Sequence, residues 1–202
     1  MDADAWDRRH ERGESPFGSV PDAAVVEHVA ALAAGRALDL GCGTGRHTLW
    51  LALRAWEVTA VDFSTAALTR AVRSAAALPR ASRDRVTWVH ADVTDLAVPQ
   101  AYDLVLACHL QLSAESRRRV LSRAATALRP GGTLLALEPE RSPSITDSGC
   151  TPEELANDLA GHLTITTATL TLADHPGRDG DPASDADPRQ ALVVGFRGPV
   201  GT

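Results

Sequence analysis

The sequence predicts an α/β protein with a mostly parallel sheet and helices on both faces. Short apolar runs alternate with helix-like segments along most of the chain, which is typical of right-handed strand–helix–strand units. The first five predicted strands lie at 37–40, 57–61, 85–90, 102–108 and 133–138. Two last strand-like segments, 164–172 and 191–197, have no helix between them. These two are therefore expected to pair as an antiparallel hairpin at one edge of the sheet.

Helical spacing of apolar residues and capping residues predict the intervening helices. Ser64 is expected to cap an alanine-rich helix, and Thr151 to cap a helix that begins at Pro152. Residues 129–132, with the sequence RPGG, are expected to separate a helix from the next strand. The predicted helices lie at 22–34, 47–54, 64–78, 113–128 and after 151.

The length of 202 residues suits one α/β domain, so residues 1–202 are predicted to form a single domain. Residues 1–20 contain two isolated aromatic residues and are interpreted as an N-terminal lid. Residues 174–189 are rich in Asp, Pro and Gly, which predicts a mobile loop.

Charge and cysteine content narrow the functional classes. The net charge of −6 leaves no basic surplus for a nucleic-acid backbone, so no nucleic-acid partner is expected. The start of the chain lacks a secretion-signal pattern, and no apolar run is long enough to cross a membrane. Three widely spaced cysteines fit neither a zinc site nor a disulfide framework, which favours the cytoplasm.

Three predicted strands end in residues suited to a nucleoside. The first runs into glycine-rich residues 41–45, where the missing Cβ atoms allow a tight turn and close approach of a ligand. The second ends at Asp62, whose carboxylate is able to accept both hydroxyls of a ribose. The third is followed by Asp92, which is able to accept from an adenine amino group. Because ligands of open parallel sheets bind at the carboxyl ends of strands, these residues are expected to meet.

The glycine spacing separates the possible cofactors. A dinucleotide fingerprint is GxGxxG, and counting from Gly41 and Gly43 its third glycine falls on Arg46. The chain instead alternates its glycines, with the third at Gly45. A pyrophosphate also needs the N-terminus of the following helix to be unobstructed, and the bulky side chain of Arg46 lies at this position. No GK[ST] follows, so the loop is not a P-loop.

The chain resembles the class I SAM-dependent methyltransferases in five successive segments: LDLGCGTG, VTAVDFS, VHADV, YDLVLACHL and LRPGGTLL. The resemblance covers residues 36–138 and implies the Rossmann-like class I methyltransferase fold, a seven-stranded sheet with a reversed terminal hairpin. The segments WDRRHERGESPFGS, RVTWVHADVTDL and TPEEL resemble most the tellurite-resistance and thiopurine branch. The implied cofactor is S-adenosylmethionine (SAM), and the implied acceptor is a small molecule.

The resemblance also implies roles for residues at the amino-acid end of the cofactor. Asp39 would help to orient the methionine amino group. Gly41 and Gly43 would admit the amino-acid end, and Cys42, a small residue in the same tight loop, is included among the cofactor contacts.

At the nucleoside end, the resemblance implies that Asp62 holds the ribose and that Phe63 lies against the adenine. Asp92 and Val93 would read the adenine edge. Taken singly, Asp62 and Asp92 would each be interpreted as ordinary helix caps, and only their order after the glycine loop favours the nucleoside role.

Cys108 and His109 would face the methyl group and the acceptor. Methyl transfer needs little from the protein, because the sulfonium is already activated and rate comes mainly from alignment and exclusion of water. A general base is required only when the acceptor holds its proton tightly, and His109 is the first candidate. Trp6 and Phe17 are expected to close over the site. No metal is expected, since the carboxylates are assigned to the nucleoside.

Several alternatives stay open at this point. His109 is equally compatible with a packed or cofactor-contacting residue, and no motif encodes the oligomeric state. A protein that binds SAM and regulates or scaffolds without turnover is one alternative function. A nicotinamide-dependent oxidoreductase is another, which the glycine spacing disfavours.

Overall fold

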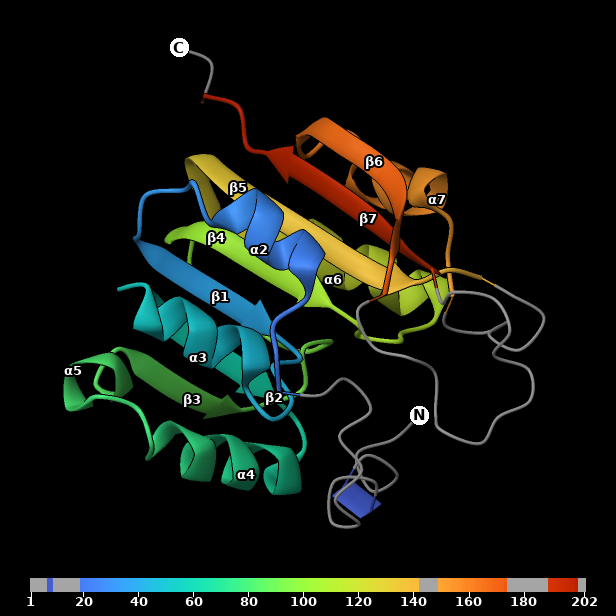
Figure 1. Ribbon diagram of the computed structural model, residues 1–202. Helices are drawn as coiled ribbons and strands as arrows, with labels where there is room; N and C mark the ends of the chain where they lie inside the picture. The colour runs from blue at the N-terminus through green and yellow to red at the C-terminus, as the bar shows by residue number, and fades with distance from the viewer. Residues whose placement is uncertain (1–6, 9–18, 142–148, 174–188, 200–202) are drawn as a thin grey trace.

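A computed structural model describes residues 7–8, 19–141, 149–173 and 189–199. Seven strands form one sheet in the order β3-β2-β1-β4-β5-β7-β6 (Figure 1). The strands are β1 (Arg36–Leu40), β2 (Glu57–Asp62), β3 (Val86–His90), β4 (Tyr102–Cys108), β5 (Leu128–Pro139), β6 (Thr164–Leu172) and β7 (Arg189–Phe196). The predicted seven-stranded, mostly parallel sheet is confirmed.

The direction of the strands also follows the prediction. Strands β3, β2, β1, β4 and β5 pair in parallel, and β7 runs antiparallel to both β5 and β6. In Figure 1 the arrowheads of β1, β3 and β4 point to one side, whereas that of β7 points the opposite way. The terminal pair is therefore antiparallel, with β6 at the edge of the sheet and β7 between β5 and β6.

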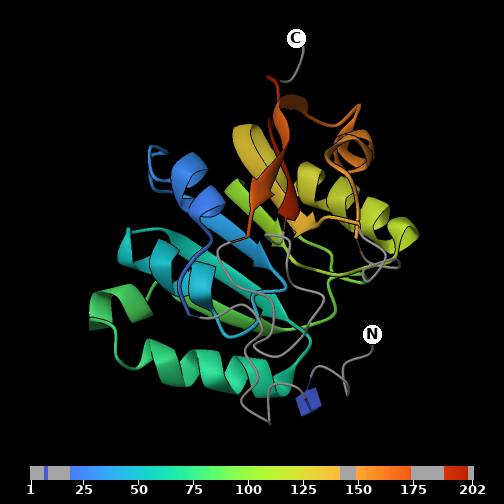
Figure 2. The same ribbon diagram turned by 45° about the vertical axis from the view of Figure 1, so that its right-hand side comes forward.

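Helices cover both faces of the sheet, as Figures 1 and 2 show. Helices α2 and α3 contribute to one hydrophobic core, and helices α6 and α7 contribute to the other. The helices are α2 (Ala23–Val29), α3 (Arg46–Leu53), α4 (Thr65–Ala75), α5 (Arg80–Arg83), α6 (Ala114–Ala127) and α7 (Pro152–Leu159). Helices on both faces are thus confirmed.

The alternation of side chains along β4 explains why this strand is almost wholly apolar. Leu104 and Leu106 point into the core on the side of α2 and α3, whereas Val105 and Ala107 point into the core on the side of α6 and α7. Successive side chains of a strand face opposite sides of the sheet, so a central strand needs apolar residues at every position.

The predicted caps are present. The Ser64 hydroxyl accepts from the Ala67 amide at 3.0 Å at the start of α4. Thr151 and Glu154 form a reciprocal capping box at the start of α7, with Pro152 as the first helical residue. Both arrangements satisfy backbone amides that a helix leaves open at its N-terminus.

Two local features differ from the sequence-based expectation. The RPGG segment does not separate α6 from the strand, because β5 already begins at Leu128, which pairs with Tyr102. The register against β4 shifts between Tyr102 and Leu104, and Gly131, with φ of +81°, takes up the irregularity. The structure also has the short helix α5, which was not predicted.

Candidate functional site

The predicted cofactor residues lie at or after the carboxyl ends of β1, β2, β3 and β4. In the sheet order, β1 and β4 are neighbours although β2 and β3 come between them in the sequence. The crossovers that leave these two strands therefore run in opposite directions, which defines the point where open α/β sheets bind ligands. The glycine loop follows β1 at this point, and Cys108 ends β4 beside it.

The glycine loop has a backbone conformation that residues with a side chain rarely adopt. Gly41 and Gly45 have φ of +66° and +87°, in the left-handed region. A Cβ on Gly41 would lie 2.5 Å from the Leu110 side chain, and one on Gly45 would lie 3.0 Å from Trp88. At Gly43, by contrast, a Cβ would meet no atom within 4 Å. The loop is thus packed closely at both ends and leaves open space at its centre.

Asp62 ties the end of β2 to the glycine loop. Its Oδ2 accepts from the Gly43 amide at 2.7 Å, and its Oδ1 accepts from the Ser64 amide at 2.8 Å. The residue is 6% exposed. The carboxylate therefore fixes both the glycine loop and the residue that caps α4.

Asp39 lies deeper, where it contacts the helix that follows the loop. Its Oδ2 accepts from the Thr48 hydroxyl of α3 at 2.5 Å, and the residue is 1% exposed. Burial raises the pKa of the Asp39 carboxyl, although the Thr48 hydrogen bond and the charge of nearby His47 oppose the shift. The Asp39 carboxylate thus anchors the start of α3 beneath the glycine loop.

The predicted adenine contacts follow β2 and β3. Asp92 is exposed and its Oδ1 accepts from the amide and the hydroxyl of Thr94, both at 2.8 Å. Val93 is buried in the core on the side of α6, so its side chain packs inward. Phe63 is half-buried, and its carbonyl oxygen lies 2.9 Å from His90 Nε2. The loops after β2 and β3 are therefore held side by side.

Cys42 and Cys108 are buried thiols beside these groups. Burial raises the pKa of both thiols well above the ordinary range, and the nearby carboxylate Asp39 raises it further. Both cysteines remain protonated at neutral pH, so neither is a reactive thiolate. Their small, uncharged side chains fill space next to the glycine loop.

His109 directly follows β4 and has φ of +57°. Its side chain is 7% exposed, and its Nε2 lies 3.3 Å from Asp22 Oδ2. Burial lowers the pKa of His109, and the charges of Arg46 and His47 lower it too, although the hydrogen bond to Asp22 opposes them. The imidazole is thus neutral at neutral pH.

Sequence reasoning missed Asp22, which was interpreted only as a helix start. The carboxylate of Asp22 meets Arg46, His47 and His109 in one buried cluster. A signal was available, because GRHT places two basic side chains at the start of α3, directly after the glycine loop. A buried cation there requires a carboxylate partner.

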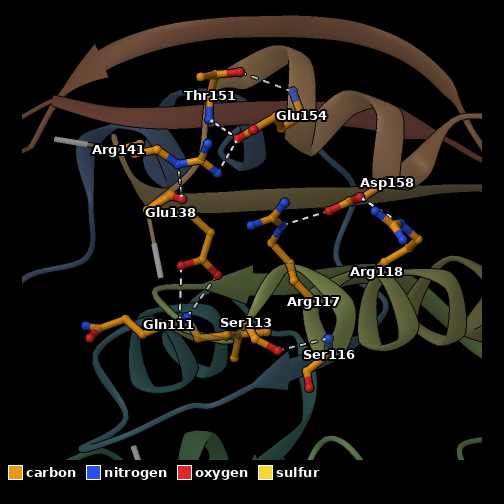
Figure 3. Close-up of polar contacts among 12 residues, drawn as sticks. Gln111, Ser113, Ser116, Arg117, Arg118, Glu138, Arg141, Thr151, Glu154 and Asp158 are labelled. Atoms are coloured by element: carbon orange, nitrogen blue, oxygen red, sulfur yellow. Dashed lines mark hydrogen bonds and ion pairs between the residues drawn. The ribbon is translucent and has the colours of Figure 1, made fainter. Parts of the chain in front are cut away.

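Sequence reasoning also missed Glu138, at the end of β5. Its carboxyl group accepts from the Leu110 amide at 3.0 Å and the Gln111 amide at 3.3 Å, and Figure 3 shows it directed toward Gln111. Burial raises the pKa of Glu138 to about 8, while these hydrogen bonds and the charge of Arg117 oppose the shift. Gln111, like His109, has positive φ, so Glu138 holds a strained loop in place. The available signal was a carboxylate directly after the apolar run LLAL in the second half of β5.

The predicted lid residues Trp6 and Phe17, and nearly all of the predicted mobile loop (174–188 of 174–189), lie outside the described residues. Asp7 is described, and its Oδ1 accepts from the Ser64 hydroxyl and the Ala66 amide at the start of α4. Asp7 therefore lies beside the first residues of α4, directly after the loop that contains Asp62 and Phe63.

Within the described ranges, no three His, Cys, Asp or Glu side chains are grouped to hold a metal ion. In the same part of the chain, no helix has the length and apolar character needed to span a membrane.

Residues 37–132 match the methyltransferase domain family. The matched segment contains β1 to β4, the glycine loop, Asp62 and His109. The match covers slightly less than half of the chain, and the strand order agrees with the Rossmann-like class I methyltransferase fold.

Individual relatives of the chain are methyltransferases whose names give different acceptors. The chain is 30% identical over 141 residues to a probable thiol methyltransferase 2 of Arabidopsis thaliana, a match that covers 65% of this chain and 60% of that protein. It is 33% identical over 106 residues to a ribosomal RNA small subunit methyltransferase C of Alcanivorax borkumensis, a match that covers 50% of this chain and 31% of that protein. The matches thus span less than two thirds of either relative.

The fold agrees over almost the whole chain with a solved structure, the CcbJ methyltransferase from Streptomyces caelestis. The TM-score is 0.74, the identity is 20%, and the match covers 98% of this chain and 100% of that one. At this identity the likeness concerns the fold.

Proposed function

We propose that the protein transfers a methyl group from SAM to a small-molecule acceptor, by in-line displacement. One observation supports this most strongly. The Asp62 carboxylate is hydrogen-bonded to the central amide of the glycine loop, within the segment that matches the methyltransferase domain family. The carboxylate proposed to bind the ribose and an open backbone turn thus lie next to each other at the switch point of the sheet.

The residues present fit this cofactor. The open space at the centre of the glycine loop offers room for a ligand without a Cβ in the way. The proposed contacts at the amino-acid end are Asp39, Gly41, Cys42 and Gly43. Those at the nucleoside end are Asp62, Phe63, Asp92 and Val93, and Cys108 is proposed to face the methyl group. SAM, when bound, supplies an activated methyl sulfonium, so the chain's own contribution is alignment and exclusion of water.

Arg46 argues against the oxidoreductase alternative. A dinucleotide pyrophosphate requires the helix N-terminus after the glycine loop to be clear. Here the first residue of α3 is Arg46, whose guanidinium is held 2.5 Å from Asp22 Oδ2 with its side chain 7% exposed. Because the positive charge of Arg46 is already paired with the Asp22 carboxylate, it is not available to bind a phosphate.

The acceptor class and location are part of the same proposal. The net charge of −6 favours a small molecule over a nucleic acid, although one relative is named as a ribosomal RNA methyltransferase. All three cysteines are free and buried, which favours a reducing cytoplasm. We further propose that residues 1–202 form one domain, because the described strands belong to one sheet, and that residues 1–20 act as a lid.

Methyl-labelled SAM tests the proposal with a panel of thiols, selenite, tellurite, phenols, amines and ribosomal RNA. Transfer of label to a small molecule, with release of S-adenosylhomocysteine, is the expected result. Transfer to RNA alone would contradict the proposed acceptor class. Tight SAM binding without transfer to any member would instead support the regulator or scaffold alternative.

A further inference from the structure

A groove between α6 and α7 is lined by basic side chains. The two helices lie side by side on one face of the sheet (Figure 2). The groove encloses about 460 Å³, a size within the range of roughly 300–1,000 Å³ that is typical of ligand sites. Its lining includes Arg118, Arg119, Ser122 and Arg123 of α6, with Asn157 near the end of α7 and His162 after it.

Helical spacing places the basic side chains along one side of α6. Arg118 and Ser122 are four positions apart, and so are Arg119 and Arg123. Side chains at this spacing are neighbours on the surface of a helix. All three arginines are exposed. Their guanidinium groups therefore line the same groove and remain accessible to a ligand from solvent.

Asp158, the carboxylate among the described residues of the groove, is already paired. Its Oδ2 lies 2.7 Å from Nε of Arg117, and the two side chains are 5% and 4% exposed. Arg118 Nε reaches the other oxygen, Oδ1, at 3.3 Å (Figure 3). Because the buried Arg117 matches the single negative charge of Asp158, Arg118 adds a positive charge that Asp158 does not balance.

The hydrogen bonds of Arg119 and Arg123 go to neutral oxygen atoms. Arg119 Nη2 donates to the Ser116 hydroxyl at 3.4 Å, and Arg123 Nη1 donates to the Thr94 carbonyl. In the described part of the chain, neither guanidinium forms an ion pair with a carboxylate. Since a guanidinium has five N–H donors, both groups keep their charge and most of their donors for a ligand.

The groove is therefore a local positive site in a chain whose net charge is −6. The C-terminus of α7 also lies at the groove, but a helix C-terminus carries only about half a negative charge, which three guanidinium groups outweigh. A guanidinium binds phosphate through two parallel hydrogen bonds. A phosphate group offers three strong acceptor oxygens and up to about two negative charges, so it suits a cluster of arginines.

We propose that this groove binds a small organic phosphate with at least two negative charges, at a second site apart from the proposed SAM site. Arg118 lies five residues after Ser113, the residue that caps α6. The groove therefore begins roughly 8 Å along the helix from the carboxyl end of β4. The inference does not depend on methyl transfer, because none of the residues proposed to contact SAM lines the groove.

Calorimetric titration of the full chain with inorganic pyrophosphate tests the proposal. Saturable binding of one pyrophosphate per chain is expected, with an affinity that falls as sodium chloride is added, because salt screens exposed charges. Citrate, which carries carboxylates in place of phosphates, is expected to bind more weakly. Tighter binding of citrate than of pyrophosphate would overturn the phosphate assignment, and no pyrophosphate binding at low salt would overturn the site.

The double variant Arg119→Gln/Arg123→Gln locates the binding. It removes two guanidinium charges from the groove and leaves the buried pair of Arg117 and Asp158 intact. The affinity for pyrophosphate is expected to fall by roughly 10-fold or more, since hydrogen bonds to charged groups are lost. Circular dichroism checks that the fold is retained.

A matched control removes the same charge elsewhere. Arg80 and Arg83 are exposed arginines of α5, which precedes β3 at the opposite edge of the sheet from β6. The variant Arg80→Gln/Arg83→Gln is expected to bind pyrophosphate as the unmodified protein does. Equal losses in the two double variants would mean that pyrophosphate responds only to overall charge, which would overturn the site.

SAM and a short single-stranded RNA separate the remaining outcomes. The variant Arg119→Gln/Arg123→Gln is expected to keep its affinity for SAM, and an equal loss for both ligands would contradict a second site. Binding of the RNA through these arginines, without binding of pyrophosphate, would overturn the small ligand. A protein that binds pyrophosphate in the groove but no SAM would remove the proposed function and leave this inference in place.

Discussion

The Asp62 carboxylate accepts a 2.7 Å hydrogen bond from the backbone amide of Gly43. This contact joins residues 19 positions apart and connects the carboxyl ends of two neighbouring strands, β1 and β2. Because Asp62 also accepts from the Ser64 amide, a single side chain shapes both the glycine loop and the start of α4. The proposed ribose contact and the shape of the loop therefore depend on the same carboxylate.

Replacing Asp62 by alanine is expected to abolish SAM binding while the fold is retained. The substitution removes the carboxylate proposed to bind the ribose. It also leaves the amides of Gly43 and Ser64 without their acceptor, but water is able to reach them once the side chain is shortened. Calorimetry measures the binding, and circular dichroism measures the fold. Asp84→Ala, at a carboxylate whose side chain is 65% exposed, serves as the control with unchanged affinity. Retained SAM affinity in Asp62→Ala would show that the ribose contact is elsewhere.

Gly45→Ala and Gly131→Ala separate backbone strain from packing. Both glycines have strongly positive φ, +87° and +81°, so both variants share a strain of about 1 kcal/mol. At Gly45 the new methyl group also meets Trp88 at 3.0 Å and Ala71 at 3.3 Å, whereas at Gly131 it meets nothing within 4 Å. In urea unfolding, Gly45→Ala is expected to lower the free energy of unfolding by about 1–3 kcal/mol more than Gly131→Ala does. Equal losses would contradict the close packing of the loop against β3 and α4.

Glu138 is expected to make the protein less stable as the pH rises. Its pKa is about 8 in the folded state and near 4.5 in the unfolded chain. The folded protein therefore binds the extra proton between these values, so the Glu138 contribution is complete below pH 4.5 and is lost as the pH rises through 8. The slope is at most about 1.4 kcal/mol per pH unit. Urea unfolding of Glu138→Gln is expected to show a flatter profile between pH 5 and 8 than the unmodified protein. Parallel profiles would mean that Glu138 is already ionised at pH 5.

Asp158 is expected to be important for packing α7 against α6. It lies 2.7 Å from Arg117, with the side chains 5% and 4% exposed, and Arg118 reaches it from the surface (Figure 3). Asp158→Asn leaves the buried guanidinium without a counter-charge, at a cost of about 3 kcal/mol in unfolding free energy. The matched variant Asp84→Asn breaks an exposed pair with Arg80 and is expected to have no measurable effect. A similar small effect in both variants would contradict the importance of burial.

The strands and their carboxyl ends were predictable because a central strand must be apolar at every position. The VTAV sequence before Asp62 and the LVLAC sequence before His109 each indicate a buried strand and the position where it ends. Segment RPGG was misread, because sequence signals for a break do not distinguish a loop from an irregular strand start with a positive-φ glycine.

The buried cluster around Asp22 was not predictable in the same way. Asp22 and His109 are 87 positions apart, and neither position carries a local signature of the contact. Glu138 likewise uses its carboxyl group on the backbone amides of Leu110 and Gln111, and amides leave no pattern in a sequence. Contacts of this kind depend on the strand order, in which β4 lies between β1 and β5.

Calorimetric titration with SAM, S-adenosylhomocysteine and NAD in parallel tests the central claim most directly. The account predicts saturable binding of the two adenosyl compounds, one per chain, and no binding of NAD. Folded protein that binds NAD, or that binds neither adenosyl compound, would contradict the claim that the glycine loop and Asp62 form a SAM site.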